Sequence, residues 1–331
     1  MKKLRLLVCF AVLLLGLVSP ARSTSQEMSD IRDLDWSTDG SRLAVGYQDG
    51  TLNILNASFQ LVRTFDVGEP MSFDWSPGPH ISWLAVANRN GEIRVIDVDT
   101  GQAILQIEDF YDFRIFSIAW SPDESRLATG HAVGSLLPNP GGVIKVWNSS
   151  TGQLETSYGH YKHGHGVHVL SWSPDGIFLA SSSQDGWVII WNSSLDEIAH
   201  HFNTGGSGLA KWSPDGTKLV TFTDILTLQT WNTTTLEPEV VLHDMSVSGI
   251  YEYEWRPGTS ELAIATGNAV VLMDAITGQE ISVTPTDARV VALAWTPDGR
   301  RLAYGGSGRL PDILDLSPQH SPTAPTPQPS E

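Results

Sequence analysis

Cysteine is almost absent from this 331-residue sequence, because Cys9 is its single thiol. A disulfide within the chain is therefore excluded, and no other position offers a thiol nucleophile. Local catalytic motifs are missing as well: the sequence has no Gly-x-Ser-x-Gly elbow, no phosphate-binding glycine loop and no His-Glu-x-x-His pair. We therefore expect a protein that is not an enzyme and that binds no cofactor.

Positive charge is also scarce. The sequence has 20 Lys and Arg residues against 37 Asp and Glu residues, which gives a formal net charge of −17 at pH 7. A surface of this sign repels phosphate backbones and anionic lipid headgroups. The composition therefore argues against nucleic acid as a partner and favours proteins or peptides.

What the sequence does contain is one repeated pattern, a tryptophan followed by Ser-Pro-Asp-Gly or a close variant. Consecutive tryptophans of this pattern lie 39 to 52 residues apart. A period of about 40 to 45 residues is typical of the four-stranded blades of a β-propeller. The pattern therefore predicts an all-β fold, a seven-bladed β-propeller of four-stranded antiparallel blades. The seven anchor tryptophans are Trp36, Trp75, Trp120, Trp172, Trp212, Trp255 and Trp295.

The fourth repeat shows how a blade follows from local rules. Val167 to Trp172 is rich in β-formers, and Ser173-Pro174-Asp175-Gly176 places each residue where a type I turn prefers it. A second strand at 177–183 and a third at 187–191 follow, separated by another tight turn. We expect three antiparallel strands joined by hairpins.

These units resemble the WD40-repeat family, over about residues 28 to 316. In the fourth repeat the resemblance implies a structural hydrogen-bond tetrad of His163, Ser181, Asp185 and Trp191. The Trp-Asp pair of the family is replaced by Trp-Asn in three repeats, and the Trp-Ser-Pro-Asp-Gly turn also occurs in propellers of the TolB type. The resemblance implies a scaffold that binds other macromolecules.

The two ends of the chain differ in composition from the repeats. Residues 1–23 start with cationic residues and continue with a short apolar run, which is typical of a signal peptide. This predicts an exported protein, periplasmic, extracellular or at the cell surface, that meets a membrane only if the segment stays uncleaved. Residues 24–316 would form the propeller, and 317–331 a proline-rich disordered tail. The last blade would be completed by a short N-terminal strand or would have three strands.

Two irregular connections indicate a partner-binding site. The third repeat has residues 130–142 where other repeats have a tight turn, and the link to the fourth repeat at 158–168 is rich in histidine. Both connections, and the aromatic link at 109–113, emerge on one face of a propeller, and loops on a rigid scaffold are where binding residues concentrate. The candidates for partner contact are Phe110, Tyr111, His131, Leu136, Leu137, Asn139, Tyr158, His160, Tyr161 and His165.

The same histidines raise the question of a metal site. His160 and His165 are the candidates, because short histidine-rich tracts bind zinc or copper. No cysteine or clear carboxylate is interleaved with them to complete a set of ligands. We therefore expect contact with a protein there rather than a metal.

Two other functions stay open at this point. A propeller hydrolase or lyase outside the cytoplasm would place three or more His, Asp or Glu side chains on the ring axis, with or without a metal, whereas a scaffold would have small or apolar side chains there. A purely structural module, attached to an envelope by its tail, would need neither face. The principal hypothesis is a monomeric scaffold that binds proteins or peptides through the face with residues 130–142 and 158–166.

Overall fold

The computed structural model describes residues 29–109, 113–133, 141–160, 166–183, 185–205, 209–224, 227–242, 249–308 and 310–317. Within these ranges the chain forms 27 strands and no helix. Accordingly, no described helix is long and apolar enough to cross a membrane. The predicted signal peptide at 1–23 and all but the first residue of the predicted tail at 317–331 lie outside the described residues.

The strands pair in chain order into seven antiparallel sheets, called blades 1 to 7. Blade 1 comprises β1 (Ile31–Trp36), β2 (Arg42–Tyr47), β3 (Thr51–Asn56) and β4 (Leu61–Asp66); blade 2 comprises β5 (Pro70–Trp75), β6 (Trp83–Asn88), β7 (Glu92–Asp97) and β8 (Gln102–Glu108). Blade 3 comprises β9 (Phe113–Trp120), β10 (Arg126–Val133), β11 (Gly142–Asn148) and β12 (Leu154–His160); blade 4 comprises β13 (Val167–Trp172), β14 (Phe178–Ser183), β15 (Trp187–Asn192) and β16 (Ile198–Asn203). Blade 5 comprises β17 (Ala210–Trp212), β18 (Lys218–Asp224), β19 (Thr227–Asn232) and β20 (Pro238–Leu242); blade 6 comprises β21 (Ile250–Trp255), β22 (Glu261–Thr266), β23 (Ala269–Asp274) and β24 (Glu280–Pro285); blade 7 comprises β25 (Val290–Trp295), β26 (Arg301–Gly306) and β27 (Asp312–Asp315).

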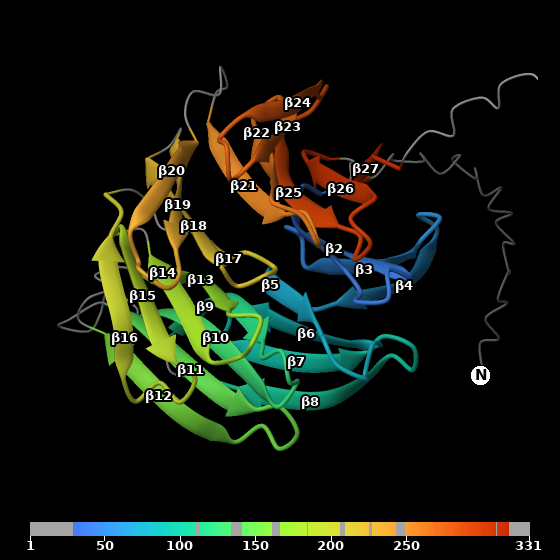
Figure 1. Cartoon of the computed structure of the whole chain (residues 1–331). Coiled ribbons are helices and arrows are strands. Elements are labelled where there is room, and N and C mark those ends of the chain that lie inside the picture. The colour runs from blue at the N-terminus through green and yellow to red at the C-terminus, as the bar shows by residue number, and fades with distance from the viewer. Residues whose placement is uncertain are drawn as a thin grey trace, which may run out of the picture.

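The seven sheets form a ring in which blade 7 (orange to red) lies beside blade 1 (blue), as Figure 1 shows. The first strand of every blade contributes to the central channel, so the inner strands surround the axis. The predicted seven-bladed β-propeller is confirmed. Blades 1 to 6 have four strands, and blade 7 has three within the described residues, which is one of the two arrangements that the sequence left open.

The repeated turn has the geometry that its residues predict. In blade 4 the backbone N–H of Gly176 donates to the carbonyl of Ser173 at 2.8 Å, and the Ser173 hydroxyl donates to the Asp175 carboxylate at 2.6 Å. Gly176 has a φ of +71°, which glycine adopts readily because it has no Cβ. The chain reverses directly after the anchor, and Trp172 pairs with Leu179.

Buried apolar side chains form seven clusters in the described part of the chain, one at each junction between neighbouring blades. The cluster at junction 7/1 brings Leu34 and Trp36 of blade 1 against Ala292 and Ala294 of blade 7. Burial of one large apolar side chain contributes about 1.5–3 kcal/mol. Among the described residues the ring is therefore closed by side-chain packing and not by a shared strand.

Candidate functional sites in the channel and on the loop face

A channel with a volume of about 670 Å³ follows the ring axis. The residue before each anchor tryptophan and the residue two positions earlier line it, because alternate side chains of a strand point to the same side. Charged groups from four blades meet there, and taken alone they are what the hydrolase or lyase alternative requires. They are Asp33, Asp35, Asp74, Lys211, Glu252 and Glu254.

Hydrogen bonds give two of these carboxylates a structural role. Asp35 accepts the backbone N–H of Trp75 at 3.1 Å, and Asp74 accepts that of Trp120 at 2.7 Å. Each bond joins the inner strand of one blade to the inner strand of the next. The carboxylates therefore hold neighbouring blades together at the axis.

Pairing and burial account for the other charges. The Lys211 ammonium lies 2.9 Å from Glu252 and 2.6 Å from Glu254. Burial lowers the pKa of Lys211, but the two carboxylates outweigh it and keep that pKa well above its ordinary value. Burial also raises the pKa of both Asp33 and Asp74 to about 7. The channel thus holds paired or readily protonated groups that connect blades.

Metal binding finds no support in the described ranges, where no three His, Cys, Asp or Glu residues are placed to hold one ion. Of the two histidines considered from the sequence, the side chain of His160 and the whole of His165 lie outside the described residues. The same holds for six partner-contact candidates: Phe110, Tyr111, Leu136, Leu137, Asn139 and Tyr161.

Blade 4 contains one bond of the predicted tetrad. The indole N–H of Trp191 donates to the Ser181 hydroxyl at 2.8 Å, and both residues are fully buried. Asp185 accepts the backbone N–H of Trp187 at 3.0 Å in the turn that follows β14. His163 lies outside the described residues, so the complete tetrad stays a prediction.

Blade 3 makes the same bond and extends it into a buried network. The indole N–H of Trp147 donates to the Thr129 hydroxyl at 2.8 Å, and that oxygen lies 2.7 Å from Nε2 of His131. Nδ1 of His131 lies 3.9 Å from the carboxylate of Asp109, which is paired with Lys145. All five residues are buried. We call Thr129, His131, Asp109, Lys145 and Trp147 the blade 3 network.

His131 is therefore not available for partner contact, contrary to the expectation from the sequence. Its exposed fraction is 0%, and burial together with the Lys145 charge lowers its pKa to about 3, so the imidazole is neutral. The acid near it comes from Asp109 at the end of β8 and not from a turn after β10, a pairing that sequence separation conceals. Tyr158 is half-buried, with its ring 4.5 Å from that of Trp191, and packs between blades 3 and 4.

Three connections start or end beside this network. Asp109 directly precedes residues 110–112. His131 and Lys145 lie on the two strands that flank residues 134–140. The network therefore ties the flanks of two connections to each other.

Two glycines bring the third connection to the same place. A Cβ at Gly166, which directly follows residues 161–165, would lie 2.5 Å from Cβ of Ala132. A Cβ at Gly130 would lie 2.8 Å from a methyl group of Val167. Only glycine permits backbones to approach so closely, so the start of β13 is pressed against the end of β10.

Sequence reasoning missed two of the three buried Trp to Ser/Thr bonds. The third is in blade 5, where the Trp231 indole donates to the Thr221 hydroxyl at 2.8 Å. The signal was available: each of these tryptophans precedes an asparagine at the end of a third strand, and the acceptor lies four residues into the second. Blade 3 obscured it, because its longer loop increases the sequence distance from Thr129 to Trp147.

Family models match three parts of the chain. The model described as WD domain, G-beta repeat, matches residues 107–148 and 152–192, which are blade 3 with its preceding link and blade 4. The model of the anaphase-promoting complex subunit 4 WD40 domain matches residues 14–83. We identify the chain as a member of the WD40-repeat β-propeller family. The same blades carry the buried Trp147 and Trp191 bonds.

Curated WD40 relatives are similar to parts of the chain. U3 small nucleolar RNA-associated protein 12 of Saccharomyces cerevisiae is 32% identical over 181 residues, covering 50% of this chain and 18% of that protein. The APC/C activator protein CDC20 of the same yeast is 25% identical over 55% of this chain and 29% of its own length. Protein HIR1 of Eremothecium gossypii is 23% identical over 80% and 33%, respectively. The chain thus spans less than a third of the first two relatives, and none of the three names is that of an enzyme, in agreement with the expectation from the sequence.

The prediction of export is wrong. The relatives include a protein associated with small nucleolar RNA and an activator of the APC/C, names that place those proteins inside the cell. In addition, the match to a WD40 domain starts at residue 14, within the segment that was interpreted as a signal peptide. A cationic start followed by an apolar run is a pattern of composition, and the comparisons outweigh it.

Proposed function

We propose that this WD40 propeller is a protein-binding scaffold whose partner contacts the loop cluster formed by residues 110–112, 134–140 and 161–165. The observation that carries the proposal is the anchoring of the described flanks of all three loops at one place. The blade 3 network connects two of them, and the close contact of Gly166 with Ala132 adds the third.

Energetics favour a binding surface built in this way. Ordering a loop on association opposes binding by about 0.5–1.5 kcal/mol for each immobilised side chain. Loops whose ends are fixed by a buried network need less ordering than loops whose ends are free. The aromatic and leucine side chains at Phe110, Tyr111, Leu136 and Leu137 are of the kinds that supply contact area at protein interfaces.

Affinity purification followed by mass spectrometry tests the proposal. The bait would be the full chain, compared with a variant in which residues 134–140 are replaced by a Gly-Ser linker of equal length. We expect at least one partner to be retained by the wild type and lost from the variant, with an unchanged melting temperature. A matched control carries Thr277→Ala, an exposed turn residue of blade 6. Equal recovery of every partner by all three baits would contradict the proposal.

A further inference from the structure

The opposite face of the ring, which we call the turn face, carries the Trp-Ser-Pro-Asp-Gly turns. There the first residue of the second strand in each blade lies close to the junction with the next blade. These seven positions are Arg42, Trp83, Arg126, Phe178, Lys218, Glu261 and Arg301.

Large planar groups cover the next anchor tryptophan at several junctions. The Arg126 guanidinium lies 5.4 Å from the Trp172 ring at junction 3/4, and Arg301 lies 5.4 Å from Trp36 at junction 7/1. At junction 4/5 the ring of Phe178 stacks on Trp212, with an interplanar angle of 14°.

The arginines at these junctions also cross to the next blade. Arg126 donates to the carbonyl of Ser193 at 2.5 Å, and Arg301 donates to that of Ala57 at 3.0 Å. Both acceptors directly follow a third strand. At junction 6/7 Arg256 takes the same place from a different position, 5.3 Å from the Trp295 ring, and donates to Gly299 at 2.7 Å.

Junction 5/6 departs from this pattern. Its position is occupied by Lys218, whose ammonium pairs with Glu239 in its own blade and so does not cross to blade 6. The turn of blade 6 differs as well: Gly258 has a φ of +71° directly after Pro257, and a Cβ there would meet nothing within 4 Å. The equivalent packing is close elsewhere, since Gly216 contacts Pro174 at junction 4/5.

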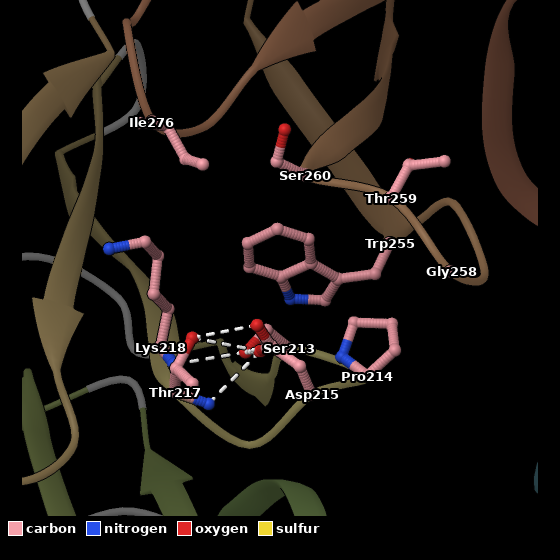
Figure 2. A pocket seen from close by; sticks show the side chains of 10 residues that line it. All are labelled: Ser213, Pro214, Asp215, Thr217, Lys218, Trp255, Gly258, Thr259, Ser260 and Ile276. Atoms are coloured by element: carbon pink, nitrogen blue, oxygen red, sulfur yellow. Dashed lines mark hydrogen bonds between the residues drawn. The ribbon is translucent and has the colours of Figure 1, made fainter.

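A pocket of about 460 Å³ results at junction 5/6. Figure 2 shows the Trp255 indole in the middle of it, between Ile276 and Ser260 on one side and Lys218 and Pro214 on the other. Asp215 also lines the pocket, and its carboxylate accepts hydrogen bonds from Ser213 and Thr217.

We propose that this pocket binds an arginine side chain of a partner protein, stacked on Trp255. The protein's own junctions show which group fits over an anchor tryptophan, and at three of them it is a guanidinium. Asp215 supplies the negative charge, as Asp123 and Asp298 do beside Arg126 and Arg301, where those arginines contribute to lowering the pKa of the carboxyl groups. A guanidinium stacks on indole more favourably than the rounder, more strongly hydrated ammonium does.

Exposed Ile276, at 56%, extends the site with an apolar contact for a neighbouring side chain of the partner. The carbonyl of Ala275 directly follows β23, as the acceptor carbonyls of Ser193 and Ala57 follow their third strands. It is therefore the expected acceptor for the bound guanidinium. The site lies on the face opposite the loop cluster, so it does not depend on the proposed function of that cluster.

Fluorine NMR on the full chain labelled with 5-fluorotryptophan tests the pocket. The probe is N-acetyl-arginine amide, and the Trp255 resonance is assigned from its disappearance in Trp255→Phe. We expect this resonance to shift with a dissociation constant on the order of 1 mM, as befits one side chain. N-acetyl-citrulline amide, which has the shape without the charge, should bind about tenfold more weakly, and so should arginine amide to Asp215→Asn. The absence of a shift, or an equal response to citrulline, would overturn the proposal.

Lys218→Arg is the decisive variant, because it places an internal arginine where junctions 3/4 and 7/1 have one. We expect it to abolish the response to the probe and to raise the melting temperature by a few degrees. Arg126→Lys is the matched control and should make the Trp172 resonance newly sensitive to the probe. A Lys218→Arg protein that responds like the wild type, or that is less stable, would show that the pocket does not fit arginine.

Discussion

Blades 3 and 4 bury the same hydrogen bond from a tryptophan to a hydroxyl, at 2.8 Å in each, but differ in what surrounds it. Blade 4 keeps tight turns and matches the family pattern in its sequence. Blade 3 has a longer connection after β10 and takes its acid from Asp109, on the preceding blade's side of the chain, with Lys145 as counter-ion. The comparison teaches that a long loop is compatible with this fold when the buried polar groups near it are satisfied by other elements.

The largest expected effect comes from breaking the ion pair of the blade 3 network. Asp109→Ala leaves the Lys145 ammonium buried without its carboxylate, so we expect the free energy of unfolding to fall by about 3–5 kcal/mol. Urea unfolding of the purified chain measures the change.

The double variant Asp109→Ala, Lys145→Met serves as the control for this prediction. It removes both charges, and we expect it to recover most of the lost stability. If Asp109→Ala alone is harmless, the network does not stabilise blade 3, and the difference between blades 3 and 4 loses its meaning.

A direct test of the likeness between the two blades is to remove the hydroxyl in each. Thr129→Val and Ser181→Ala both leave a buried indole N–H without its acceptor, which lowers the free energy of unfolding by about 1–3 kcal/mol. We expect similar losses from both in thermal or urea unfolding. Thr64→Val on the exposed strand β4 is the control and should change stability by less than about 0.5 kcal/mol.

The neutral imidazole makes blade 3 sensitive to acid. Burial, and then the Lys145 charge, lower the pKa of His131 from 6.5 to about 3, so the folded protein binds fewer protons than the unfolded chain between these values. Its contribution to stability is fully present above pH 6.5 and is lost as the pH falls toward 3. In His131→Gln the slope of stability against pH in this window should shrink, by at most about 1.4 kcal/mol per pH unit. An unchanged slope would mean that His131 is not buried in its neutral form.

The channel has the opposite dependence on pH. Burial raises the pKa of Asp33 and Asp74 from 3.8 to about 7, so the stability from their protonated forms is full below about pH 4 and is lost as the pH rises to 7. Asp74→Asn keeps an oxygen that accepts the N–H of Trp120 and cannot ionise. We expect this variant to match the wild type near pH 4 and to be the more stable of the two at pH 8.

Asp74→Ala completes this test at the axis. It lacks the acceptor, and we expect it to be less stable than Asp74→Asn by about 1 kcal/mol at every pH. Thermal unfolding followed by circular dichroism separates the three proteins. A wild type that gains stability from pH 4 to pH 8 by more than Asp74→Asn does would contradict the structural role assigned to the axial acids.

The repeat pattern was enough to predict the ring, because a tryptophan and a turn with fixed residue preferences act locally and recur seven times. The same reasoning misplaced His131, since its burial depends on Asp109, which joins it across two strands. It also gave no sign of the pocket at junction 5/6. That pocket depends on where the side chain of Lys218 turns and on a change of turn geometry at Gly258, and neither is visible in a residue pattern.

Native-state hydrogen exchange is the most direct test of the central claim, that the blade 3 network anchors the flanks of the loop cluster. The wild type would be compared with Asp109→Ala, with β22 and β23 of blade 6 as the internal reference. We predict that the amides of β10, β11 and the start of β13 lose protection in the variant, while those of blade 6 keep theirs. Equal loss of protection in blades 3 and 6, or none in either, would contradict the account.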